Sequence, residues 1–83
     1  MNEIKREVRL YMEDDDGGRY GEIILEELDG GLYDITHTLV EQRMAGKGIA
    51  GKLVEAAVLY VYEKGGKVKA TCSYAQHWLE KNK

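Results

Sequence analysis

Proline is absent from the 83-residue sequence, and cysteine occurs only once. A single cysteine excludes an internal disulfide and a zinc site built from several cysteines, so we expect a reducing, cytoplasmic setting. No apolar run approaches the length of a membrane span or of a signal peptide's hydrophobic segment. Without proline, glycine is left to make the turns.

An excess of positive charge is also missing, because the formal net charge is −3 at pH 7. Proteins that bind nucleic acid usually present a basic face, so we expect no nucleic-acid partner and no membrane partner. Hydrophobic residues make up 43% and charged residues 33% of the chain, which is typical of a globular protein rather than a disordered one. The length predicts one domain over residues 1–83 with a small core.

Three stretches in the first half of the chain have the patterns of β-strands. Residues 4–12 alternate between apolar and polar, residues 19–28 do so less regularly, and residues 32–40 alternate again. Glycine-containing turns at 14–18 and 29–31 separate them, which predicts an antiparallel meander. In the third strand we expect one face to carry Tyr33, Ile35, His37 and Leu39.

Three successive aspartates, Asp14 to Asp16, raise the possibility of a calcium site. They lack the alternating ligands and the glutamate at position twelve that an EF-hand loop requires. We therefore expect a solvated hairpin tip and no metal.

The second half of the chain predicts a long helix, a strand and a short helix. The long helix runs from about Ile49 to Lys64 and is stopped by the glycine pair that follows it. We expect its buried face to hold Ile49, Leu53, Ala56, Ala57, Tyr60 and Val61, with Val54 and Val58 at the flank. The fourth strand covers residues 67–72, and the crossover places it parallel to the third.

Ser73 is predicted to cap the short helix, which runs from Tyr74 to about Lys81 and is anchored by Trp78 and Leu79. Together these elements predict an α+β fold with a mixed sheet of about four strands, one long helix and one short helix.

The turn before the long helix has the features of an anion site. No Ser, Thr, Asp or Asn stands at the helix start, so its first backbone N–H groups are available, and they carry the positive end of the helix dipole. Gly46 and Gly48 allow close approach of a ligand, and Arg43, Lys47 and Lys52 add positive charge. The alternative is that the glycines only turn the chain and that water caps the helix.

Several segments resemble a known family. The run Arg43-Met44-Ala45-Gly46-Lys47-Gly48 fits the pattern Q/R-x-x-G-x-G/A and resembles the coenzyme A pyrophosphate loop of GNAT-superfamily acetyltransferases. Together with His37-Thr38-x-Val40, Leu53-Val54 and Cys72-Ser73-Tyr74-Ala75, it resembles the small, single-domain GNAT-like acetyltransferases over roughly residues 32–82. Two residues depart from the family pattern: Ala45 stands where Arg or Gly is frequent, and Ala70 where close relatives often have Pro.

The resemblance implies a coenzyme A-dependent N-acyltransferase that moves an acetyl group from acetyl-CoA to a primary amine of a protein or a small molecule. It implies that the backbone from Met44 to Ala50 holds the pyrophosphate, with Arg43 and Lys47 as charge partners. The cofactor-binding residues that it implies are Val40, Arg43, Met44, Ala45, Gly46, Lys47, Gly48, Ile49, Ala50, Cys72 and Ser73.

Cys72, His37 and Tyr74 are the candidate catalytic residues. Cys72 ends a strand where a helix begins, a position that suits an acetyl-accepting thiolate, but it is also a plausible small buried hydrophobe. An imidazole is a natural proton acceptor, but His37 on an apolar face is also typical of a hydrogen-bonded core residue. Tyr74 falls where the resemblance implies a tyrosine acid.

A second function remains open, in which the chain holds acyl-CoA or a partner protein without turnover. The small GNAT-like members lack the helical pair that walls the acceptor cleft, which leaves little surface to position a substrate. We expect a monomer or a weak homodimer, since an exposed strand edge permits pairing.

Overall fold

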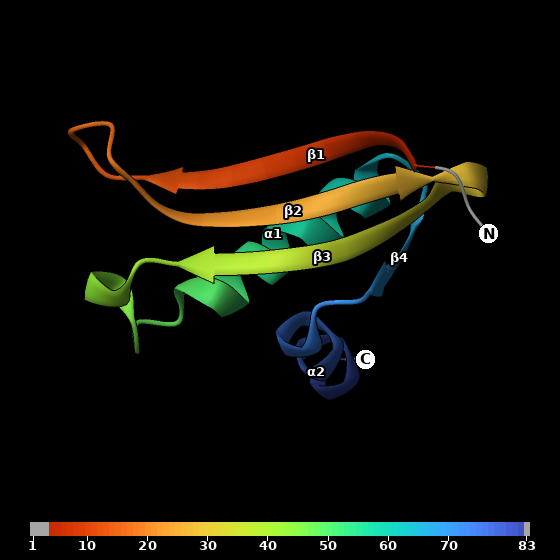
Figure 1. Ribbon diagram of the computed structural model, residues 1–83. Helices are drawn as coiled ribbons and strands as arrows, with labels where there is room; N and C mark the ends of the chain where they lie inside the picture. The colour runs from red at the N-terminus through yellow and green to blue at the C-terminus, as the bar shows by residue number, and fades with distance from the viewer. Residues whose placement is uncertain (1–3, 83) are drawn as a thin grey trace.

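The computed structural model describes residues 4–82, with side chains from residue 6 onward. The elements in chain order are β1 (Ile4–Glu13), β2 (Arg19–Leu28), β3 (Leu32–Val40), α1 (Ile49–Glu63), β4 (Lys67–Ala70) and α2 (Ser73–Lys81). The strands form one sheet in the order β1-β2-β3-β4, in which β4 runs parallel to β3 and the other pairs are antiparallel (Figure 1). This α+β architecture confirms the predicted fold.

The first hairpin follows directly from the local sequence. In β1, Val8, Leu10 and Met12 are half-buried, and the residues between them are exposed, as the alternation predicts. The predicted side-chain positions of residues 4 and 5 lie outside the described part. In the turn, the Asp14 carboxylate accepts hydrogen bonds from the amides of Asp16 and Gly18 at 3.1 and 2.9 Å, so the acidic turn is a hairpin tip.

Helix α1 packs across one face of the sheet and closes the core (Figure 1). Its buried residues lie at helical spacing and face apolar side chains of β2 and β3. The core consists of Ile23, Leu25, Tyr33, Ile35, Ile49, Leu53, Val54, Ala57, Val61 and Ala75.

Two details of the predicted helix face were wrong. The buried row continues at four-residue steps from Ile49, and Val54, which we expected at the flank of the buried face, is fully buried in the core. Ala56 lies on the opposite flank and is exposed. Tyr60 is half-buried and meets Tyr33 edge-on, with ring centroids 6.0 Å apart.

A bulge in β3 changes which residues share a face. Leu25 pairs with Ile35 and Ile24 pairs with His37, so Thr36 is an extra residue on β3. Because one inserted residue reverses the alternation, His37 and Leu39 lie on the opposite face from Ile35, and both are exposed. The prediction that all of them share one face was therefore wrong.

Helix α2 begins one residue earlier than predicted, at Ser73. Cys72 occupies the N-cap position with an extended backbone, and no side chain forms a capping hydrogen bond there, so the predicted Ser73 cap was wrong. Ala75 is the fully buried residue of this helix, whereas Trp78 and Leu79 are half-buried. Neither helix within residues 4–82 has the length and apolar character needed to cross a membrane.

Candidate functional site

The start of α1 presents a run of unpaired backbone donors. Gly48 precedes the helix in the left-handed conformation, with φ of 75°, and no side chain caps the helix. Within residues 4–82, the amides from Gly46 to Gly51 donate to no protein acceptor, and Lys52 makes the first bond, to the Gly48 carbonyl at 3.2 Å. Free amides next to the positive end of a helix dipole are typical of an anion-binding position.

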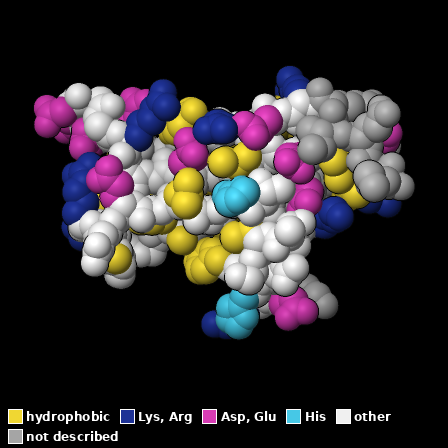
Figure 2. Space-filling model, in the orientation of Figure 1, with side chains coloured by type: hydrophobic (Ala, Val, Ile, Leu, Met, Phe, Trp, Pro, Cys, Tyr) yellow, Lys and Arg dark blue, Asp and Glu magenta, His cyan; other side chains and the backbone are white. Residues whose placement is uncertain are grey.

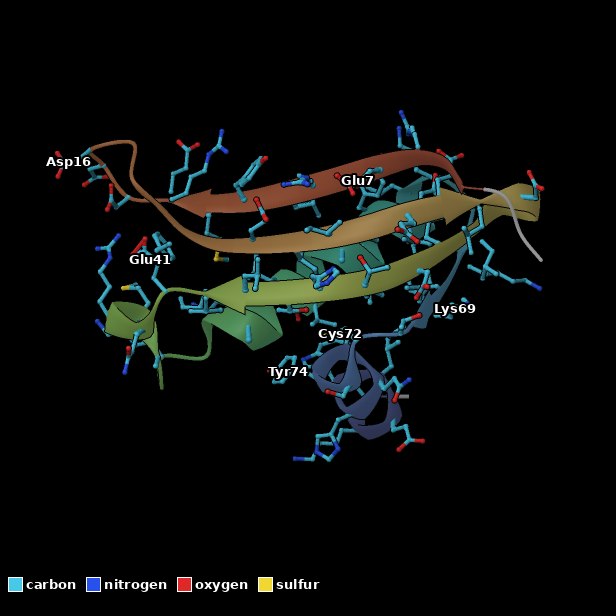
Figure 3. The ribbon with its side chains drawn as sticks, in the orientation of Figure 1. Glu7, Asp16, Glu41, Lys69, Cys72 and Tyr74 are labelled. Carbon is cyan, nitrogen blue, oxygen red and sulfur yellow. The ribbon has the colours of Figure 1, made fainter. Side chains whose placement is uncertain are left out.

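A shallow hollow of about 230 Å³ lies against this helix start. It brings together most of the residues that the resemblance implies for cofactor binding, and it adds Tyr74 from α2. The lining residues are Val40, Met44, Ala45, Gly46, Gly48, Ile49, Ala50 and Tyr74. The hollow is not lined by Arg43, Lys47, Cys72 or Ser73. Figure 3 shows Cys72 and Tyr74 together at the start of α2.

The donor run is shorter than the sequence predicts. The Met44 amide donates to the Glu41 carbonyl at 2.9 Å, and the Ala45 amide donates to the Gln42 carbonyl at 3.0 Å. These bonds belong to the 3-10 turn Gln42–Met44, which leads from β3 toward α1. The amides of Met44 and Ala45 are therefore occupied, and the available donors begin at Gly46.

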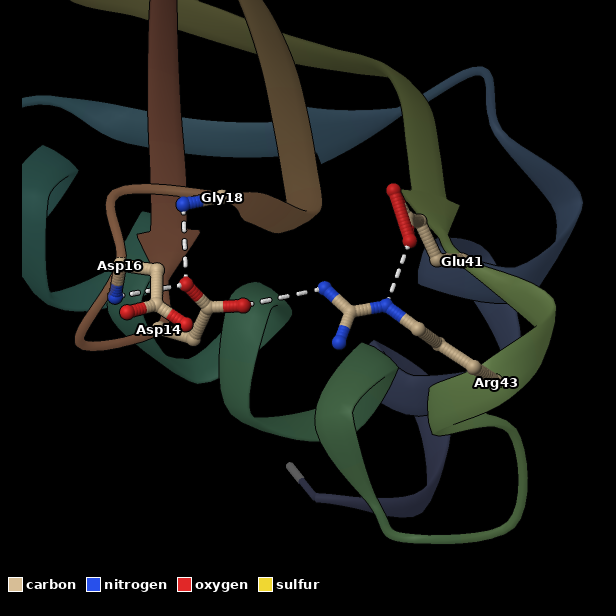
Figure 4. A network of polar contacts seen from close by, with 5 residues as sticks. All are labelled: Asp14, Asp16, Gly18, Glu41 and Arg43. Atoms are coloured by element: carbon tan, nitrogen blue, oxygen red, sulfur yellow. Dashed lines mark hydrogen bonds and ion pairs between the residues drawn. The ribbon is translucent and has the colours of Figure 1, made fainter.

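Arg43 is held by two carboxylates rather than standing free for an anion. Its Nε donates to Glu41 at 2.7 Å, and its Nη2 donates to Asp14 at 3.2 Å, which ties the first hairpin to the turn before α1 (Figure 4). Bonds from the Gly18 amide and then from Arg43 hold the pKa of Asp14 below its ordinary value. An anion that recruits Arg43 must compete with both carboxylates.

Cys72 lies at the second helix start, half-buried between β3 and α2. Its Sγ is 3.7 Å from the Thr38 hydroxyl. Partial burial by itself would raise the pKa of the thiol. Hydrogen bonds from the Ala75 amide, the Thr38 hydroxyl, the Tyr74 amide and the Thr38 backbone together outweigh burial, so the pKa of the thiol is lowered. The environment therefore favours the thiolate.

His37 is not brought together with Cys72. Adjacent residues of a strand point to opposite faces, so His37 points away from the face on which Thr38 meets the thiol. The imidazole is exposed, and its Nδ1 lies 3.2 Å from the Thr36 hydroxyl. This is the face without α1, where Tyr11 is 38% and Leu39 is 53% exposed. Figure 2 shows this face, where the histidine near the centre (cyan) lies beside hydrophobic side chains (yellow).

Strand β3 extends beyond its pairing with β4. The parallel ladder ends at Ile35 and Ala70, whereas β3 continues to Val40. Within residues 4–82, no strand pairs with this edge of β3 after Ile35. The unpaired part of this edge includes Thr38, whose hydroxyl lies 3.7 Å from the Cys72 Sγ.

Three residues of this region were not predicted from the sequence to belong to the site. Thr38 contacts the thiol, and the only sequence signal for it is its place in the motif beside His37. Gly51 lies where α1 meets α2, because a Cβ there would make an ordinary van der Waals contact of 3.5 Å with the Tyr74 hydroxyl. Asp34 is a buried carboxylate in an otherwise apolar run. Within residues 4–82, no group of three or more His, Cys, Asp or Glu could hold a metal ion.

Comparisons with known proteins agree with this geometry. The model of a family described as GCN5-related N-acetyl-transferase matches residues 9–83. Protein NATD1 of Xenopus tropicalis is 39% identical and that of Gallus gallus 33% identical, each over 60 residues and 72% of this chain. The match spans about half the length of these relatives, 55% and 54% respectively.

Solved structures show the same fold. A GCN5-like protein from Staphylococcus aureus, solved by NMR, is 36% identical and superimposes with a TM-score of 0.71, covering 96% of this chain and 79% of that one. An IAA acetyltransferase from Bacillus cereus is 23% identical, with a TM-score of 0.74, and the match covers 94% of this chain and 54% of that one. At 23% identity the second likeness carries the fold alone.

Proposed function

The chain belongs to the GCN5-related N-acetyltransferase family, and on that premise we propose that it transfers an acetyl group from acetyl-CoA to a primary amine. Members of this family typically use acetyl-CoA. The single observation that carries the proposal is the run of unpaired amides from Gly46 to Gly51 beside a hollow. Those donors and the helix dipole suit a diphosphate, because each phosphate oxygen can accept an amide hydrogen bond.

The residues present fit the cofactor in three respects. Gly46 and Gly48 carry no side chain and have open space around their Cβ positions, so a diphosphate can approach the backbone. Lys47, which precedes the helix, and Lys52, which lies in its first turn, are exposed and supply positive charge. The unpaired edge of β3 from Thr36 to Val40 offers backbone groups to a pantetheine arm. When bound, acetyl-CoA supplies an activated thioester.

We assign the acceptor to the face of the sheet that α1 does not cover. There, His37 is exposed and accepts a proton from the attacking amine, whose nitrogen bonds to the thioester carbonyl carbon as the carbon–sulfur bond breaks. On the other side, the Tyr74 hydroxyl lines the hollow and donates a proton to the departing sulfur. In this proposal the two sides meet at the edge of β3 beyond Ile35, where no strand pairs with β3 within residues 4–82.

Cys72 offers a second route through a covalent intermediate. Its thiolate would attack the thioester carbonyl carbon, release coenzyme A and leave an acetyl-cysteine, which the amine then attacks to regenerate the thiol. The lowered pKa of Cys72 favours this nucleophile at neutral pH. The two routes differ in one observable, the presence of acetylated Cys72.

A transfer assay with acetyl-CoA and a panel of amines, including polyamines and lysine peptides, tests the function. We expect acetylated product with at least one acceptor and its loss in His37→Gln. Mass spectrometry after rapid quenching distinguishes the routes: acetyl on Cys72 without acceptor supports the covalent route, and activity retained in Cys72→Ala supports direct transfer. Absence of product with every amine would overturn the transferase proposal.

One observation favours a second candidate, a module that binds acyl-CoA without turnover. Within residues 4–82 no helix covers the face that carries Tyr11, His37 and Leu39, so little surface positions an acceptor (Figure 2). Coenzyme A binding without acetylation of any amine or of Cys72 would favour this module.

A further inference from the structure

Asp34 is the most deeply buried charged residue within residues 6–82, and the proposed chemistry does not use it. It is 7% exposed on β3, one residue before the bulge region begins at Ile35. A buried carboxylate is costly unless hydrogen bonds satisfy it, so its contacts show what it does.

Both carboxylate oxygens of Asp34 bind one residue, Thr71. Oδ1 accepts from the Thr71 amide at 2.8 Å, and Oδ2 accepts from the Thr71 hydroxyl at 2.7 Å. Thr71 is the first residue after β4 ends, so this pair of bonds fixes the chain where it leaves the sheet.

The same junction is held a second time by the backbone. The Ile35 carbonyl accepts from the amides of both Thr71 and Cys72, each at 3.0 Å. Cys72 therefore begins α2 from a fixed point, with Sγ 3.7 Å from the Thr38 hydroxyl. The Ile35 carbonyl and the Thr38 hydroxyl, both of β3, are thus the hydrogen-bond partners that hold Cys72 on the side of the sheet.

From this arrangement we propose that Asp34 is a positioning residue, which acts through Thr71 to hold the Cys72 thiol against Thr38 and the first turn of α2. The inference rests on the proposed role of Cys72 in the acetyl site. It adds a residue outside the motifs that carry the family resemblance.

The test measures the rate of Cys72 alkylation by iodoacetamide against pH, in the full chain and without coenzyme A. Asp34→Ala removes both contacts, so the thiol pKa should rise and the alkylation rate at pH 7 should fall about three- to tenfold, since the rate follows the thiolate fraction. Asp34→Asn keeps an acceptor for the Thr71 amide and a donor for the Thr71 hydroxyl, and should stay within about twofold of wild type by the same relation.

The asparagine variant also separates charge from geometry. Removing a negative charge near Cys72 would lower the thiol pKa, which is the direction opposite to loss of positioning. Asp15→Ala, at an exposed aspartate in the β1–β2 turn, is the matched control and should leave the profile unchanged.

Folding is checked by circular dichroism and thermal melting of each variant. If Asp34→Ala does not fold, Thr71→Val decides, because it removes the hydroxyl bond and keeps the amide bond; its thiol pKa should rise by a smaller amount. A folded Asp34→Ala with the same pH profile as Asp34→Asn, which has lost the same charge, would overturn the proposal. Where Asp34→Ala does not fold, a folded Thr71→Val with the wild-type pH profile would overturn it.

Coenzyme A titration of the same proteins keeps this inference separate from the function. Wild-type chain that fails to bind coenzyme A defeats the acetyltransferase proposal, whereas the thiol profiles still decide the role of Asp34. Where binding occurs, Asp34→Ala should bind coenzyme A within about twofold of wild type, because none of its hydrogen bonds involves the start of α1.

Discussion

The two helix starts of this protein are both uncapped, but they are prepared for different anions. At the start of α1, the amides from Gly46 to Gly51 have no protein acceptor within residues 4–82, so any anion that binds them comes from outside the described chain. At the start of α2, Cys72 itself occupies the cap position, and nearby amides favour its thiolate. The first site is open to a diphosphate, and the second stabilises a group that becomes charged during chemistry.

Blocking the open amides at the start of α1 should have the largest effect on coenzyme A binding. Gly46→Trp places an indole over the open amides and should weaken coenzyme A binding by at least about 100-fold, because the amides then face a side chain instead of phosphate. Isothermal titration measures this. Gly65→Trp, at the other end of α1, is the matched control, since both glycines have positive φ, 79° and 72°, and open space around them. The control should bind normally; equal loss in both would place the site elsewhere.

Positive charge around the first site should have the next largest effect. Lys47→Gln combined with Lys52→Gln should raise the coenzyme A dissociation constant about tenfold at low salt, because exposed charges act over a Debye length. At high salt the difference from wild type should shrink. Lys67→Gln, at the start of β4, is the control and should bind as wild type does. A double variant that matches wild type at low salt would remove these lysines from the site.

The second site is tested through its pH dependence. Because the pKa of Cys72 is lowered and the thiolate is the reactive form, alkylation of Cys72 should become half-maximal at a lower pH than alkylation of an unstructured cysteine peptide measured beside it. Thr38→Val should shift the profile to higher pH and reduce the rate at pH 7 about threefold. Thr36→Val serves as control, since its hydroxyl bonds the Ile24 carbonyl. Identical profiles for all three proteins would contradict the assignment.

The smallest expected effect concerns Arg43, which links the first site to the hairpin. Asp14→Asn retains an oxygen for the Gly18 amide but weakens the hold on Arg43, so coenzyme A should bind about twofold to threefold more tightly, in line with the small worth of exposed ion pairs. Titration calorimetry at low salt checks it, with Asp16→Asn as the matched aspartate control. Weaker binding would mean that Asp14 positions Arg43 instead of competing for it.

The sequence was sufficient for features that depend on local pattern. Alternation in β1, helical spacing in α1 and glycines around Gly46 predicted the strands, the helix and the open turn, because each depends on residues close together in the chain. The parallel pairing of β3 with β4 followed from the length of the crossover.

Features that depend on tertiary contacts were not predictable in the same way. A one-residue bulge at Thr36 places His37 on the uncovered face, opposite to the predicted one. The alternation of residues in the sequence does not predict such a bulge. Arg43 was expected at the phosphate, but Asp14, distant in sequence, binds it. Asp34 and Thr71 meet only once β3 and β4 pair, so their role at Cys72 is visible only in the folded chain.

The central claim is that the open amides at the start of α1 receive the diphosphate of coenzyme A. The most direct measurement is a ¹H–¹⁵N NMR titration of the labelled chain with coenzyme A, and with pantetheine, which lacks the diphosphate. We predict the largest amide shifts from Gly46 to Ala50 with coenzyme A and small shifts there with pantetheine. Shifts confined to other residues, or none at millimolar coenzyme A, would contradict the account.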